Sequence, residues 1–157
     1  NYPWAKLYKK ELFDEIEFPV NIQRFEDAYT IFKTMIKAKR IGNVSKRYYH
    51  YMQHAGSLTN HMNIEMVYQM RDSVEYQDMY LKKAYPKETF HFDQQYFNAD
   101  MMILYTMLRQ KNHAKYMPAT IDWEQIHPIY HMAYLIWRKY VLWRLGYSTR
   151  TQEDFGH

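Results

Sequence analysis

The sequence has 157 residues, of which 47% are apolar, and this length predicts one domain with a single core. Its 21 basic and 17 acidic residues are interspersed and leave a net charge of +4, so the chain lacks the segregated basic stripe of a dedicated nucleic-acid-binding protein. Cysteine is absent, which excludes disulfides, cysteine-ligated zinc sites and thiol catalysis.

The beginning of the chain predicts an N-terminal arm over residues 1–20. Pro3 and Pro19 bracket a segment that can form only a short helix, with Trp4 as an aromatic anchor.

A longer amphipathic helix is expected over residues 23–40. Asn21 is its expected N-cap, and Gly42 is expected to end it because glycine accepts a left-handed C-terminal cap.

Further helices are expected along the rest of the chain, and each is bounded by a residue that favours a cap or a break. One runs over residues 45–55, and the next begins at Ser57 or Thr59. Another begins at Asp72 or Ser73 and ends before Pro86, and a fourth opens at Asp93 or Asn98. No segment alternates apolar and polar residues as a half-buried strand does. The sequence therefore predicts an all-α fold of six to seven helices, with residues 21–146 as one helical domain and residues 147–157 as a C-terminal tail.

The last expected helix begins at Pro128 and is closed by Gly146, after a turn over residues 122–125. At helical spacing, one broad apolar face collects Ile129, Tyr130, Ala133, Ile136, Trp137, Tyr140 and Val141, and Met132 and Trp143 widen it. His131 and Arg138 form a narrow polar stripe almost opposite. Such a helix must be covered either by other helices of this chain or by a partner.

A spacing of 35 residues relates four of the expected helices. Stepping from Phe32 reaches Val67, Met102 and Trp137, and stepping from Met35 reaches Met70, Tyr105 and Tyr140. The segment 24–35 resembles the second helix of a pentatricopeptide repeat, and residues 49–70 resemble a degenerate second copy. The resemblance, which covers residues 23–74, implies stacked helical hairpins that bind organellar RNA through the first helix of each repeat, here around Tyr48 and Tyr49. These tyrosines do not match the polar base-reading residues of that family.

The histidines are the candidates for metal chemistry. Glu124 and His127 have the Glu-x-x-His spacing of di-iron bundles, and His131 follows four residues later. A di-iron site needs two such motifs and two further carboxylates on facing helices, and only one motif is present. The sequence therefore predicts no metal site, no cofactor and no catalytic residues, and it leaves a His/Glu metal-binding helical protein as a remote alternative.

The aromatic content favours an extensively contacted protein. The chain has 17 Tyr and 4 Trp, which are enriched where a surface is buried against a partner, although a compositional bias would give the same counts.

We expect a non-catalytic accessory subunit of a large mitochondrial assembly, on the matrix side or associated with the inner membrane. A respiratory-chain or ATP synthase complex is the first choice, and an RNA-associated protein such as a mitochondrial ribosome component is the alternative. A membrane span needs a run of about 20 apolar residues, and the sequence contains no such run. The predicted partner contacts are Trp4, Tyr48, Tyr49, Trp123, Trp137 and Trp143.

Overall fold

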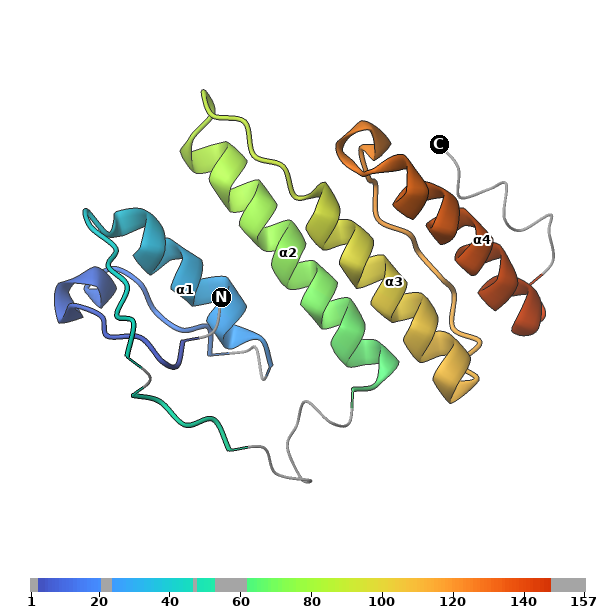
Figure 1. The fold of residues 1–157 in the computed structure, drawn as a ribbon, viewed down its shortest axis with the longest axis horizontal. Coiled ribbons are helices and arrows are strands. Elements are labelled where there is room, and N and C mark those ends of the chain that lie inside the picture. Colours follow the sequence, from blue (N-terminus) through green and yellow to red (C-terminus); the bar gives the residue numbers. More distant parts are fainter. Residues whose placement is uncertain (1–2, 21–23, 47, 53–61, 148–157) are drawn as a thin grey trace.

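The described part of the chain forms four α-helices, which lie side by side in the order of the sequence (Figure 1). The computed structural model describes residues 3–20, 24–46, 48–52 and 62–147, and every regular element within these ranges is helical. The helices are α1 (Glu26–Lys37), α2 (Ile64–Ala84), α3 (Asp93–Gln110) and α4 (Pro128–Arg144). Two short 3-10 turns, η1 (Lys10–Phe13) and η3 (Trp123–Gln125), precede α1 and α4. The all-α class is confirmed, whereas the predicted number of helices was too high.

Two expected helices merge into α2, which explains part of this difference. α2 begins after Asn63, whose side chain accepts a hydrogen bond from the backbone N–H of Met66 at 2.9 Å. Ser73, expected to cap a separate helix, lies inside α2 and donates its hydroxyl to the carbonyl of Met70 at 2.6 Å. This bond within the helix satisfies the serine without ending the helix. The alternative caps at Ser57 and Thr59 lie outside the described residues.

The helix expected over residues 45–55 is not found in its described part. Residues 45–46 and 48–52 have no helical conformation, and the remainder of that segment lies outside the described residues. α1 is also shorter than expected. Phe25 adopts a left-handed conformation with φ of 60°, so the helix begins only at Glu26, and Ala38 is extended, so it ends before Gly42. The expected cap Asn21 is outside the described residues.

The helices do not form a series of stacked hairpins. α2 and α3 run antiparallel, but residues 111–127 return along the molecule and place α4 parallel to α3 (Figure 1). The α-helices begin at residues 26, 64, 93 and 128, which is not a constant interval. These helices therefore do not form a degenerate 35-residue repeat of helix pairs.

The main core lies between α3, α4 and the returning segment 111–127, and α2 closes it from the other side of α3. Met107 and Ile103 of α3 are fully buried there, and Tyr116 and Ile126 from the returning segment cover them. α1 packs on the opposite flank of α2, where Phe32 makes edge contacts with Tyr76 and Tyr80. Because the helices of the described residues form one row, α1 and α4 each have only one neighbouring α-helix among them.

None of the described helices combines the length and the apolar character that crossing a membrane requires.

Truncation of Met107 tests whether the space between α3 and α4 is the core that holds the fold. Met107 is 0% exposed and Met102, five residues earlier on the same helix, is 39% exposed. We expect Met107→Ala to lower the free energy of unfolding by about 2–5 kcal/mol, because it leaves a cavity. Met102→Ala is the matched control and should cost less than about 1 kcal/mol. Urea unfolding followed by circular dichroism measures both, and equal losses would contradict this placement of the core.

Candidate functional site

The structure places the tryptophans predicted as partner contacts in different environments. Trp123 and Trp137 pack on the core of this chain. The Trp123 ring stacks on His131 with 4.1 Å between ring centroids and also lies against Tyr134. Trp143, by contrast, is 68% exposed. Of the tryptophans near and on α4, only Trp143 therefore offers most of its ring to a partner.

Trp4 brings the N-terminal arm against the segment that follows α1. Its ring stacks on Tyr49 and on Tyr51, with centroid distances of 5.6 and 4.9 Å. Tyr48 is exposed, and the backbone around it is extended rather than helical. The first repeat helix implied for Tyr48 and Tyr49 by the pentatricopeptide resemblance is therefore absent from the described residues 48–52.

The apolar stripe of α4 is turned away from the rest of the molecule. We call it the outer α4 face, and it consists of Ile129, Met132, Ala133, Ile136, Tyr140 and Trp143. Its residues recur every three or four positions along the whole helix, and each of them is exposed. The sequence correctly indicated that these side chains share one face. It did not indicate that the described part of the chain leaves that face uncovered.

The opposite, inner face of α4 includes the predicted polar stripe, and it also includes Val141, which was wrongly predicted to lie on the broad apolar face. Tyr134, Val141 and Leu142 are buried on this side, and His131 and Arg138 are half-buried beside them. The guanidinium of Arg138 lies 5.8 Å from the centre of the Tyr116 ring. α4 thus buries Tyr134, Val141 and Leu142 against the core and leaves a second apolar stripe exposed, whereas an ordinary surface helix exposes a polar face.

A buried carboxylate explains this orientation of α4. Asp100 of α3 has no exposed surface, and its Oδ2 accepts a hydrogen bond from the backbone N–H of Ala119 at 2.9 Å. The hydroxyls of Tyr116 and Tyr134 lie 3.2 and 3.4 Å from the same oxygen and 2.8 Å from each other, so the two phenols and the carboxylate form one hydrogen-bonded group. Arg71 of α2 places its Nη1 3.7 Å from Asp100 Oδ1. Since a buried charge is stable only when it is paired and hydrogen-bonded, these partners must stay in place. Tyr134 reaches the carboxylate only with the inner α4 face toward α3.

Burial also shifts the titration of this cluster. Loss of solvation raises the pKa of Asp100, and the hydrogen bond from Ala119 and the charge of Arg71 oppose that shift only in part. Burial and the adjacent Asp100 charge raise the pKa of Tyr134 to about 12, and the same two causes raise the pKa of Tyr116. The two phenols therefore remain protonated donors at neutral pH.

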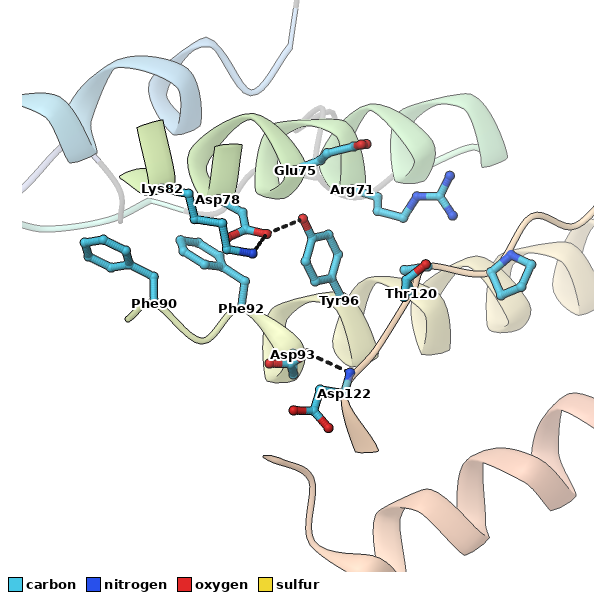
Figure 2. Close-up of a pocket in the computed structure, with 12 residues that line it drawn as sticks. Arg71, Glu75, Asp78, Lys82, Phe90, Phe92, Asp93, Tyr96, Thr120 and Asp122 are labelled. Carbon is cyan, nitrogen blue, oxygen red and sulfur yellow. Dashed lines mark hydrogen bonds and ion pairs between the residues drawn. The ribbon is translucent and has the colours of Figure 1, made fainter. Parts of the chain in front are cut away.

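The described residues also form a polar hollow of about 530 Å³, between the C-terminal half of α2, the start of α3 and residues 118–122 (Figure 2). Phe90 and Phe92 lie at one end of it and Arg71 at the other. In the middle, Asp78 Oδ2 accepts hydrogen bonds from Lys82 Nζ at 2.9 Å and from the Tyr96 hydroxyl at 3.2 Å. The hydrogen bond between Tyr96 of α3 and Asp78 of α2 thus joins the two helices inside the hollow.

Most charged groups around the hollow are occupied within the chain. The Asp93 side chain accepts a hydrogen bond from the backbone N–H of Asp122 at 2.8 Å. The Asp122 side chain in turn accepts a hydrogen bond from the backbone N–H of Glu124. Arg71 donates to the carbonyl of Met117 in addition to its ion pair with Asp100. These bonds fasten residues 117–124 to α2 and α3, and they identify the hollow as part of the scaffold that positions α4.

The histidines near α4 have structural partners. His127 caps α4, because its Nδ1 accepts a hydrogen bond from the backbone N–H of Ile129 at 3.3 Å, and His131 stacks on Trp123. The described residues contain no group of three or more His, Asp or Glu side chains placed to hold a metal ion. The arrangement gives no support to the metal-binding alternative at Glu124, His127 and His131.

Asp100 was not identified from the sequence, although a signal for it exists. It lies three residues after Phe97 and four before Leu104, on the apolar face of the expected helix. A carboxylate at such a position indicates a buried, hydrogen-bonded acid. The sequence has 17 tyrosines, however, and nothing in it distinguishes Tyr116 and Tyr134 as the partners of Asp100.

The raised pKa of Asp100 predicts a specific dependence of stability on pH. The folded state holds the Asp100 proton more tightly than the unfolded state, so the contribution of this group to stability falls as pH rises from about 4, the unfolded value, through the folded pKa. Asp100→Asn carries no titratable group. We expect the stability advantage of the wild type over Asp100→Asn to be larger at pH 4 than at pH 7.

Urea unfolding of both proteins across this pH range measures the difference. Asp72→Asn, which alters an exposed carboxylate on α2, is the control. A wild-type advantage that grew with pH would contradict the sign derived from burial.

Comparison with protein-family models, with curated proteins and with solved structures finds no match for this chain.

Proposed function

We propose that this chain is a non-catalytic architectural subunit of a large protein assembly and that it binds a neighbouring subunit through the outer α4 face. The observation that carries the proposal is the orientation of α4. Seven large apolar side chains of this one helix are 42–68% exposed while its inner face is fixed by the core.

The extent of this surface separates it from the scattered apolar residues of an ordinary monomer. Tyr and Trp side chains carry about 150–250 Å² each, so the exposed fractions along α4 amount to several hundred Å² of contiguous apolar area. Patches of that size on soluble proteins mark interaction sites. Anchors spaced three and four residues apart are the pattern by which one helix packs on another or in a groove.

A mitochondrial complex, on the matrix side or beside the inner membrane, is the setting we propose for this subunit. The basic, cysteine-free and aromatic-rich composition supports it, and a respiratory-chain or ATP synthase complex is the first choice. In such a complex the chain would act by filling space between subunits, with α4 as the contact helix. Its rigid row of helices suits that role because the contact face is held by the fold before binding.

An RNA-associated role is the second candidate, and a different part of the molecule favours it. Tyr48 projects beside Tyr49 and Tyr51, directly after the basic run of residues 33–47. Exposed aromatic rings next to basic side chains form the stacking surfaces on which single-stranded RNA binds. This role would not use the outer α4 face.

A charge placed on the outer α4 face tests the proposal. We expect the tagged wild-type chain to migrate on native gels of cell extracts in a particle much larger than the 19.5 kDa monomer. Ile136→Glu should release the chain from that particle, because burying a carboxylate without a partner is unfavourable. Ile136 is 66% exposed, so the substitution should leave the fold intact.

Met79→Glu is the matched control, since Met79 is similarly exposed but lies on α2. It should remain in the particle, and circular dichroism should show both variants folded. A wild-type chain that migrates as a monomer, or an Ile136→Glu variant that stays assembled, would overturn the proposal. Loss of the particle on ribonuclease treatment would instead favour the RNA-associated role.

A further inference from the structure

The outer α4 face has a rim of one charge sign. α4 contains Arg138, Lys139 and Arg144 and has no acidic residue between Pro128 and Arg144. Lys139 follows Ile136 by three positions and precedes Trp143 by four, so it lies along one side of the face. Arg144 follows Tyr140 by four positions and lies along the other side. Both are exposed, and both flank the C-terminal half of the stripe.

These two cations have no acidic partner within the described chain. The ion pairs found there join Lys37 to Glu15, Arg71 to Asp100 and Lys82 to Asp78. Arg138 differs from its two neighbours because it is half-buried over the Tyr116 ring. The side of α4 that carries the apolar stripe is thus bordered by positive charge that the described fold does not neutralise.

We infer that the occupant of the outer α4 face is an α-helix of another protein whose apolar side is bordered by Asp or Glu residues opposite Lys139 and Arg144. This inference rests on the proposed function and adds the chemistry of the partner. Complementary charges at the rim of an apolar contact fix its register and exclude wrong partners. The apolar stripe supplies the buried area, and the two cations determine which helix can lie on it.

A helix fits the stripe because of its shape. The exposed apolar residues form a seam along the whole of α4, and Ala133 lies near its middle. A small residue at that point allows a second helix to approach closely, while Ile136 and Met132 fill the grooves on its surface. Tyr140 and Trp143 at one end supply the large rings that often dominate binding energy.

Charge argues against a second copy of this chain as the occupant. If two α4 helices packed face to face, each stripe would bring its own basic rim and no carboxylate from α4 would meet it. Like charges across an interface are unfavourable. An anionic membrane surface would also attract these cations, but a helix that lies on such a surface turns a polar face rich in Lys and Arg toward water. The side of α4 opposite the stripe is packed on the core instead, and only Lys139 and Arg144 border the stripe.

A zero-length carbodiimide crosslink tests the charge pairing directly in the assembled particle. This reagent joins an amine to a carboxylate only when the two are in contact. We expect mass spectrometry to find Lys139 coupled to an Asp or Glu of a partner protein. Lys139→Arg keeps the charge but has no amine that can be coupled, so this variant should assemble normally and lose the crosslink. An assembled wild-type particle in which Lys139 forms no crosslink to another protein would contradict the inference.

Charge reversal supplies the second measurement. The double variant Lys139→Glu/Arg144→Glu should reduce incorporation into the particle by about tenfold. Lys9→Glu/Lys10→Glu, which reverses two exposed charges of the N-terminal arm, is the matched control and should leave incorporation unchanged. Normal incorporation of the α4 double variant, together with release of Ile136→Glu, would overturn the partner chemistry and leave the docking face intact. Retention of Ile136→Glu would instead overturn the proposed function itself.

A membrane occupant has its own outcome. Purified chain that floats with vesicles of phosphatidylcholine and phosphatidylglycerol, and that loses this binding in the α4 double variant, would show that the face binds lipid and would overturn the inference. Absence of flotation, with the crosslink present, supports an acidic helix.

Discussion

Asp100 lies without exposed surface in a core built mainly of apolar side chains, and groups from three other parts of the chain surround it. Tyr116 and Ala119 come from the returning segment, Tyr134 comes from α4, and Arg71 comes from α2. A buried carboxylate that loses such partners is left with its full cost of desolvation. These contacts therefore act together to hold α4 beside α3 in one rotational setting, and the features of α4 that concern function follow from that setting.

With Tyr134 turned toward Asp100, the outer α4 face is turned away from the core. The inner side buries Tyr134, Val141 and Leu142, and the outer side exposes a second apolar stripe. The hydrogen bonds to the buried acid hold this apolar seam at the end of the row of helices, where no other α-helix of the described residues covers it (Figure 1). Preorganisation of this kind lowers the entropy that a partner must overcome on binding.

The polar hollow beside α2 and α3 has a supporting role in the same arrangement (Figure 2). Its carboxylates accept backbone and side-chain hydrogen bonds that fasten residues 117–124, and this segment carries Ala119 to Asp100 and Trp123 to His131. Two polar clusters, one around Asp78 and one around Asp100, thus support the apolar core at successive points between α2 and α4. The two polar clusters and the outer α4 face are parts of one arrangement.

The sequence by itself determined the helical class, the positions of α1, α3 and α4 along the chain, and most of the residues that share the outer α4 face, because these depend on caps, breaks and a period of 3.6 residues. It wrongly added Val141, which is buried on the inner face, and it divided α2 at Ser73, which resembled a cap but bonds within the helix. Only the tertiary structure decided which side of α4 is buried. Periodicity assigns the more apolar side to the core, whereas the actual choice depends on hydrogen bonds from Tyr116 and Tyr134 to Asp100, residues 16 and 34 positions away from it. Contacts at such separations leave no periodic trace in the local sequence.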